Sequence, residues 1–339
     1  MFSQPQLYAD AGRNQIYQSW FRSSKLVDKT LCEIGFGSGI LSMLALQCLP
    51  KHIIAYERNG ELYEYAQWCL KKSGLQNRIT LYNEHVTPAD VTGDVDVIFH
   101  ELVGDAGIWD EGVYDFVTMP MPVIPSVYST EFYIIPLDYG QLWDAKRKSL
   151  PFHHYGFSQF LSDDLHHSVE RRAKDFKMEC QVLECHDKEG IAAYVNHMND
   201  LLQNNNFVHT PQQLKKDQFQ ALMRTSHQVG SVVYNTVSRT VDVSDYASTQ
   251  RYSMDDFSLE QLEIVVPRSQ LHIDYMLIAV ARLSHNGQVI KCENYSSWGS
   301  VGVWNFISSR QNHPRDLHIT FKNKTNLWGN LTPYLNVTQ

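Results

Sequence analysis

The residues best suited to binding a charged cofactor end the first apolar segment, in Glu33-Ile-Gly-Phe-Gly-Ser-Gly39. Gly35, Gly37 and Gly39 allow a tight turn and let a ligand approach the backbone closely. Glu57 ends the next apolar segment, 22 residues after Gly35, where a carboxylate can accept hydrogen bonds from both ribose hydroxyls. These residues predict a site for a cofactor that contains a nucleoside. The glycines and Glu57 would suit a nicotinamide dinucleotide equally well.

Two details favour S-adenosyl-L-methionine over a dinucleotide. The pattern G-x-G-x-G lacks the later glycine that packs helix against strand in pyrophosphate-binding turns. Glu33, just before the first glycine, would repel a pyrophosphate but suits the cationic end of S-adenosylmethionine. We therefore expect S-adenosyl-L-methionine as the cofactor.

Alternating strands and helices must position this site. Strands at the amino end of the chain are predicted at 30–34, 52–56, 79–82 and 95–99, with helices at 40–48 and 61–72. Such alternation predicts an α/β fold with a parallel, doubly wound Rossmann-like sheet. Ligands of such sheets bind at the carboxyl ends of the central strands.

After a proline-rich stretch near residue 125 the pattern changes. Longer strands are predicted at 128–136, 231–243, 262–266, 271–283 and 289–293, which indicates a mostly antiparallel β-barrel. Helices are predicted at 192–202 and 211–227, with a loop at 203–206 between them. We predict a cofactor domain over 1–125 and a substrate domain over 126–339, with a helical arm or insertion at about 142–228.

Composition narrows the classes of partner. The chain has 339 residues, 43% hydrophobic and 19% charged, and a net charge of −8, which excludes a disordered chain and argues against nucleic-acid binding. No segment reads as a secretory signal or a membrane span, so we expect a cytoplasmic protein. Cys180, Cys185 and His186 could be metal ligands, but the paired spacing of zinc sites is missing, and we expect no metal.

A cluster of acids follows the fourth predicted strand, in His100-Glu-Leu-Val-Gly-Asp-Ala-Gly-Ile-Trp-Asp-Glu-Gly112. This segment resembles the acidic hairpin of the protein arginine methyltransferase family, which carries two glutamates. Arg13-Asn-Gln-Ile-Tyr17 resembles the family's helix over the cofactor, and residues 33–43 and 121–125 resemble its first motif and its proline-rich crossing into the barrel. The resemblance covers residues 7–135.

The resemblance implies an S-adenosylmethionine-dependent arginine N-methyltransferase with two acids that hold the substrate. Glu101 matches the first. Asp110 has the family spacing, nine residues after Glu101, whereas Glu111 is followed by Gly112 as in the family. We favour Glu111 and keep Asp110 as the alternative.

The chemistry fits this implication. A guanidinium stays protonated, with a pKa of roughly 13.8, and attacks poorly until its charge is drawn away from one nitrogen. Two carboxylates concentrate the charge on the nitrogens they bind and leave a lone pair on the third. A carboxylate can then accept the proton lost during methyl transfer.

The resemblance also assigns residues around the cofactor and the acceptor. Arg13 would pair with the carboxylate of the cofactor, and Val86 would lie by its adenine. Gly35, Gly37 and Glu57 would border its methionine and ribose. Tyr17 and Trp298 would shape the substrate pocket.

Two positions depart from the family. Ser296-Ser-Trp298 replaces Thr-His-Trp, so Asp10 loses its imidazole partner. His100 replaces the Ser or Thr before the first glutamate, and is either a catalytic residue or simply a packed one.

Several functional alternatives stay open. The substrate is either protein or peptide arginine or free L-arginine, and we expect a homodimer. A catalytically silent regulatory partner of an arginine methyltransferase would also account for the shifted second acid. A methyltransferase acting on another small-molecule amine would leave the paired acids unexplained.

Overall fold

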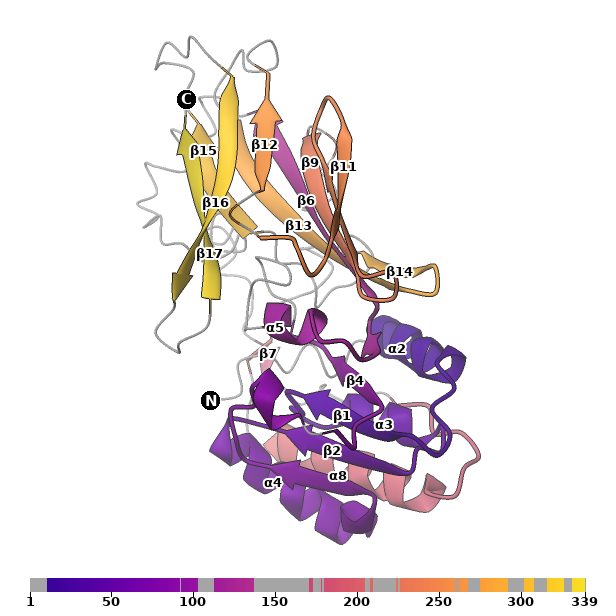
Figure 1. Cartoon of the computed structure of the whole chain (residues 1–339). Helices are drawn as coiled ribbons and strands as arrows, with labels where there is room; N and C mark the ends of the chain where they lie inside the picture. Colours follow the sequence, from indigo (N-terminus) through magenta and orange to yellow (C-terminus); the bar gives the residue numbers. More distant parts are fainter. Residues whose placement is uncertain are drawn as a thin grey trace.

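The computed structural model has two layered parts, a parallel sheet with its helices and, beyond it, antiparallel sheets (Figure 1). It describes residues 11–91, 93–102, 113–136, 171–172, 178, 180–204, 208–209, 224, 226–258, 260, 262–267, 275–291, 302–307, 316–325 and 331–338.

The described residues form a five-stranded parallel sheet in the order β3-β2-β1-β4-β5. Its strands are β1 (Thr30–Ile34), β2 (His52–Tyr56), β3 (Ile79–Tyr82), β4 (Val97–His100) and β5 (Val123–Ile124). The first three have the predicted bounds, and β4 lies slightly later than the predicted 95–99. Because the strand order reverses between β1 and β4, their carboxyl ends form the edge at which such sheets bind ligands.

Helices flank this sheet. They are α2 (Ala11–Ser23), α3 (Ile40–Leu46), α4 (Gly60–Lys72), α5 (Val113–Val117) and α8 (Lys188–Asn204), with 3-10 turns η1 (Leu75–Asn77) and η2 (Pro88–Asp90). The predicted helix 40–48 ends two residues early, and the predicted helix 192–202 lies within α8, whose end at Asn204 runs into the predicted loop 203–206. Most of the predicted helix 211–227 lies outside the described residues, and His227 begins a strand instead.

Antiparallel sheets make up the second part, as predicted. Seven strands join in one sheet: β6 (Val127–Pro136), β9 (His227–Asn235), β10 (Thr240–Ser244), β11 (Thr249–Ser253), β13 (Tyr275–His285), β14 (Gln288–Lys291) and β15 (Gly302–Ile307). A second sheet holds β12 (Glu263–Val266), β16 (Leu317–Thr325) and β17 (Leu331–Thr338), and a short pair holds β7 (Arg171–Arg172) and β8 (Val208–His209). These counts refer to the described ranges.

The single strand predicted over 231–243 is wrong, because a turn divides it into β9 and β10. The Asn235 side chain accepts hydrogen bonds from the backbone amides of Val237 and Ser238, both at 3.0 Å. Arg239 adopts a left-handed φ of 51°. An asparagine that bonds to the backbone just ahead of it favours a turn over continued strand.

Helix α2 joins the two parts. Its Trp20 and Phe21 are fully buried in a core that continues from the parallel sheet into the antiparallel strands. His285 lies at the end of β13. Its Nε2 is hydrogen-bonded to the Ser24 hydroxyl at 2.9 Å, and its Nδ1 is hydrogen-bonded to the Ser126 hydroxyl at 3.0 Å. The helix that covers the ligand edge is therefore fixed by the antiparallel part.

None of the described helices has both the length and the hydropathy needed to cross a bilayer. Among the same residues, no three potential ligand side chains are grouped so as to hold a metal ion. The five described cysteines are free thiols: Cys32, Cys48, Cys69, Cys180 and Cys185.

Candidate active site

The glycine-rich turn after β1 has the backbone conformation that only glycine adopts easily. Gly35 and Gly37 have φ values of +75° and +57°. The amide of Gly35 donates to the carbonyl of Tyr56 at 3.0 Å, which ties the turn to the end of β2. A Cβ on Gly35 would lie 2.6 Å from Leu102 Cδ2, so a side chain there would displace the Leu102 side chain as well as strain the backbone.

Glu57 faces this turn. One carboxylate oxygen accepts a hydrogen bond from the Gly37 amide at 2.8 Å, and the other accepts one from the Asn59 amide at 2.7 Å. Asn59 in turn caps α4, because its side chain accepts from the Leu62 amide at 3.0 Å. A carboxylate has about four lone pairs, so Glu57 keeps acceptor capacity for hydroxyl groups of a ligand.

Glu33, on β1 just before the turn, is 1% exposed. It accepts a hydrogen bond from the Ser42 hydroxyl on α3. Burial raises the pKa of Glu33 well above its usual range, while the Ser42 hydrogen bond and the nearby charge of Arg13 act in the opposite direction. The acid before the first glycine is therefore a buried group that ties β1 to α3.

Arg13 and Glu101 form a buried ion pair at the same edge. Arg13 Nη2 donates to Glu101 Oε2 at 2.9 Å, with the two side chains only 3% and 7% exposed. The Arg13 guanidinium carbon also lies 5.5 Å from the centre of the Tyr17 ring. The residue expected to bind the cofactor carboxylate thus contacts the residue expected to hold the substrate.

Tyr17 and His100 brace the start of the acidic segment. The Tyr17 hydroxyl donates to the backbone carbonyl of His100 at 3.0 Å. His100 Nε2 is hydrogen-bonded to the Tyr128 hydroxyl at 2.8 Å, and the two rings stack 5.7 Å apart. Burial lowers the pKa of His100 to about 3, so its imidazole is neutral near pH 7. These contacts favour a positioning role for His100 over proton transfer.

The remaining predicted residues divide into two groups. Val86 is buried in a cluster with Tyr56, at the end of β2 next to Glu57. Gly39, with a φ of 76°, is the residue that precedes α3. Asp10, Asp110, Glu111 and Trp298 lie outside the described residues.

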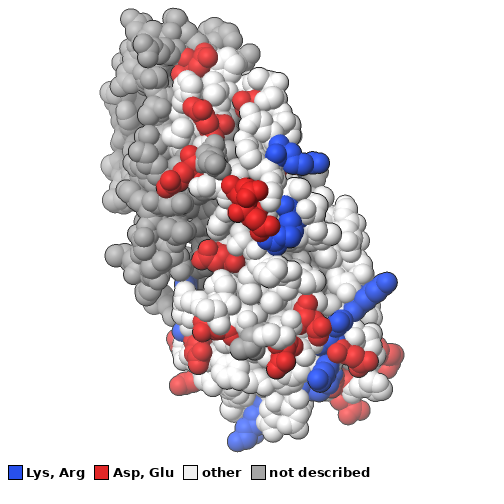
Figure 2. Space-filling view, viewed as in Figure 1, with Lys and Arg blue, Asp and Glu red and all other residues white. Residues whose placement is uncertain are grey.

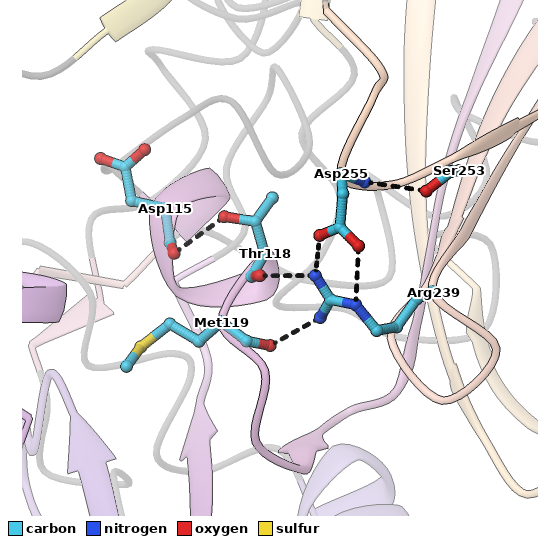
Figure 3. A network of polar contacts seen from close by, with 6 residues as sticks. All are labelled: Asp115, Thr118, Met119, Arg239, Ser253 and Asp255. Carbon is cyan, nitrogen blue, oxygen red and sulfur yellow. Dashed lines mark hydrogen bonds and ion pairs between the residues drawn. The ribbon is translucent and has the colours of Figure 1, made fainter. Parts of the chain in front are cut away.

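Arg239, which was not predicted from the sequence, links the antiparallel part to the end of α5 (Figure 3). Its guanidinium donates to the carbonyls of Met119 at 3.1 Å and Thr118 at 3.4 Å, and pairs with Asp255. The last carbonyls of a helix accept no hydrogen bond from an amide of the same helix, so a cation that donates to them stabilises the helix end. An arginine in a polar turn carries no motif that could have revealed this.

This link matters because α5 begins at Val113, directly after the segment that holds Asp110 and Glu111.

On the face seen in Figure 2, Asp and Glu side chains are spread over both parts of the molecule, with smaller groups of Lys and Arg between them. That distribution agrees with the net charge of −8.

Sequence comparisons find distant methyltransferase relatives. The chain is 28% identical over 107 residues to protein arginine N-methyltransferase 6 of Xenopus tropicalis, covering 31% of each chain. It is 33% identical over 85 residues to the ribosomal protein L11 methyltransferase of Photorhabdus laumondii, covering 25% of this chain and 28% of the relative. The chain therefore spans less than a third of the length of these relatives, and no protein-family model matches it.

Solved structures match over almost the whole chain. A crystal structure of PRMT6-SAH has a TM-score of 0.52 at 12% identity, covering 98% of each chain. A second structure of PRMT6 has a TM-score of 0.50 at 13% identity, with the same coverage. The chain thus has the fold of a protein arginine methyltransferase, which confirms the predicted fold class.

Proposed function

We propose that the chain is an S-adenosylmethionine-dependent N-methyltransferase that acts on a guanidino nitrogen of arginine. One observation carries this proposal. Glu101, at the carboxyl end of β4, holds the guanidinium of Arg13 at 2.9 Å in a nearly water-free position beside the glycine-rich turn. A carboxylate in such a position needs a cationic partner, and a planar guanidinium matches its geometry.

The residues around the turn fit the cofactor. Gly35 offers bare backbone in a left-handed conformation, and Glu57 offers carboxylate oxygens for ribose hydroxyls. Val86, buried in the same cluster as Tyr56, would lie by the adenine. Arg13 has five N–H donors, so it can keep Glu101 while it donates to the carboxylate of a ligand. When bound, S-adenosylmethionine supplies a methyl group on a positively charged sulfur.

The acids of this chain prepare the acceptor. Glu101 and a second carboxylate, Glu111 or Asp110, hold two nitrogens of the substrate guanidinium, so that positive charge concentrates there. The third nitrogen would then keep a lone pair able to accept the methyl group that bound S-adenosylmethionine would supply. The methylated nitrogen loses one proton to a carboxylate and from there to water.

His100 and Tyr17 position Glu101 in this mechanism. A neutral, buried imidazole cannot take up the proton near pH 7, since burial holds its pKa at about 3. The bonds from Tyr17 to the His100 carbonyl and from His100 to Tyr128 fix the backbone directly before Glu101.

A transfer assay tests the proposal. The purified chain would be incubated with methyl-labelled S-adenosylmethionine and, in separate reactions, an arginine- and glycine-rich peptide, free L-arginine and a lysine-containing peptide. We expect label on the guanidino group of the arginine- and glycine-rich peptide or of free L-arginine. Label on the lysine peptide would favour the alternative of another amine methyltransferase. Cofactor binding without any transfer would favour the silent regulatory partner.

A further inference from the structure

Helix α8 comes from the segment inserted between strands of the antiparallel part, yet it lies beside α4 of the parallel-sheet part (Figure 1). One face of the helix is buried in the main core, with residues at helical spacing: Ile191, Tyr194, Val195 and Met198. The inserted segment thus contributes part of the packing around the predicted cofactor site.

Specific contacts fix α8 along its length. Just ahead of the helix, Asp187 pairs with Arg78 Nε at 3.0 Å. Gly190 permits the close approach, because a Cβ there would lie 2.8 Å from Leu75 Cδ2. Further along, the His197 ring packs edge-on against Trp68 of α4, with ring centres 5.3 Å apart.

Tyr194 extends from this helix to the glycine-rich turn. Its side chain is fully buried, and its hydroxyl donates to the backbone carbonyl of Ser38 at 2.8 Å. A Cβ on Gly39 would lie 2.6 Å from the same hydroxyl, so the turn passes directly over it. The contact is made at the point where the turn leads into α3.

We propose that Tyr194 is a positioning residue for the cofactor, acting by holding the Ser38–Gly39 part of the turn in the conformation that receives the ligand. A turn with several left-handed residues has few internal bonds, so an outside hydrogen bond raises the fraction of molecules in the binding conformation. The apparent affinity falls in proportion to that fraction when the bond is lost. The identity of the ligand rests on the proposed function, whereas the bracing of the turn does not.

Removal of one hydroxyl tests this inference. In the full chain, Tyr194→Phe keeps the buried ring and deletes the bond to Ser38. We expect S-adenosylhomocysteine, measured by titration calorimetry, to bind about tenfold more weakly, the size that one lost hydrogen bond to a buried carbonyl allows. Backbone amides of residues 35–39 should exchange hydrogen faster in the ligand-free protein, with α4 and α8 unchanged.

Asp187→Asn is the matched control, because it weakens the attachment of α8 at a partly buried ion pair without touching the turn, and binding should stay within about twofold. Unchanged affinity and exchange in Tyr194→Phe would overturn the inference. Faster exchange throughout α3, α4 and α8 would also overturn it, because Tyr194 would then be a packing residue only. If the wild type binds no S-adenosylhomocysteine, the proposed function fails, and the exchange of residues 35–39 alone decides the bracing role.

Discussion

The Arg13 guanidinium and the Glu101 carboxylate meet at 2.9 Å although 88 positions separate them in the chain. This contact joins α2, which the antiparallel part fixes through Ser24 and His285, to the carboxyl end of β4. The position predicted for a substrate guanidinium is thus one that a guanidinium already fits.

The Arg13–Glu101 pair should contribute to stability as a coupled unit. Arg13→Gln and Glu101→Gln should each lower the free energy of unfolding by about 3 kcal/mol, because each leaves one charge buried without its partner. The double variant should lose about 1–3 kcal/mol less than the sum, measured by urea unfolding at pH 7. Additive losses would show that the two side chains do not interact. The exposed Lys29–Asp96 pair is the control, with an expected coupling below about 1 kcal/mol.

Glu57→Gln should weaken cofactor binding. The Glu57 oxygens accept from two backbone amides, and an amide group would set an N–H against one of these donors. We expect the dissociation constant of S-adenosylhomocysteine to rise at least about tenfold by calorimetry. Asp96→Asn is the matched control, because that carboxylate also accepts a backbone amide, from Thr30, but at the opposite end of β1. Equal losses in both variants would refute a direct role for Glu57.

His100 should make the protein less stable in mild acid. Its folded pKa, about 3, lies below the value of about 6.5 for an exposed imidazole, so the unfolded chain binds the extra proton between these values. Stability therefore falls as the pH drops below 6.5, by up to about 1.4 kcal/mol per pH unit, and is unaffected by His100 above it. Urea unfolding at pH 6.5 and 5.0 should show a loss about 2 kcal/mol larger in the wild type than in His100→Asn. Parallel pH profiles would contradict the neutral, buried imidazole.

The second substrate acid should be Glu111. Glu111→Gln should reduce the rate of methyl transfer at least about a hundredfold, as expected for a group that stabilises charge in the transition state. Asp110→Asn should leave that rate within a few-fold. Both rates would be measured at saturating cofactor, so that affinity does not enter. The reverse result would show that Asp110, and not Glu111, matches the second acid of the family, and would assign the role to Asp110.

Local patterns in the sequence were sufficient for the first three strands of the parallel sheet, but not for β5, a strand of two residues in the proline-rich stretch. β1, β2 and β3 are short apolar runs that end at glycines or polar residues, and their bounds were predicted correctly. The turn at Gly35 and the acid at Glu57 were predicted to lie together because both follow adjacent strands, and the Gly37–Glu57 hydrogen bond confirms that they do.

Contacts between distant segments could not be predicted in this way. Arg13 and Glu101 were each assigned to a ligand, and nothing in either motif indicates that they bind one another. Arg239 and Tyr194 lie in segments without any motif, and only the folded chain brings them to α5 and to the glycine-rich turn. The turn at Asn235 was missed because β-branched residues on both sides of it favour strand, while one side chain bonded to the backbone decides the turn.

The most direct test of the account is methyl transfer by Glu101→Gln, with cofactor affinity measured on the same samples. Glu101 is proposed to polarise the acceptor, whereas Glu57 and Arg13 bind the cofactor, so the two quantities should separate. We predict that the wild type methylates an arginine substrate in a single turnover and that the variant does so at least about a hundredfold more slowly. Its dissociation constant for S-adenosylhomocysteine should change less than about threefold, because the five N–H donors of Arg13 are unchanged in the variant. Equal transfer rates in the two proteins, or no transfer by the wild type, would contradict the account.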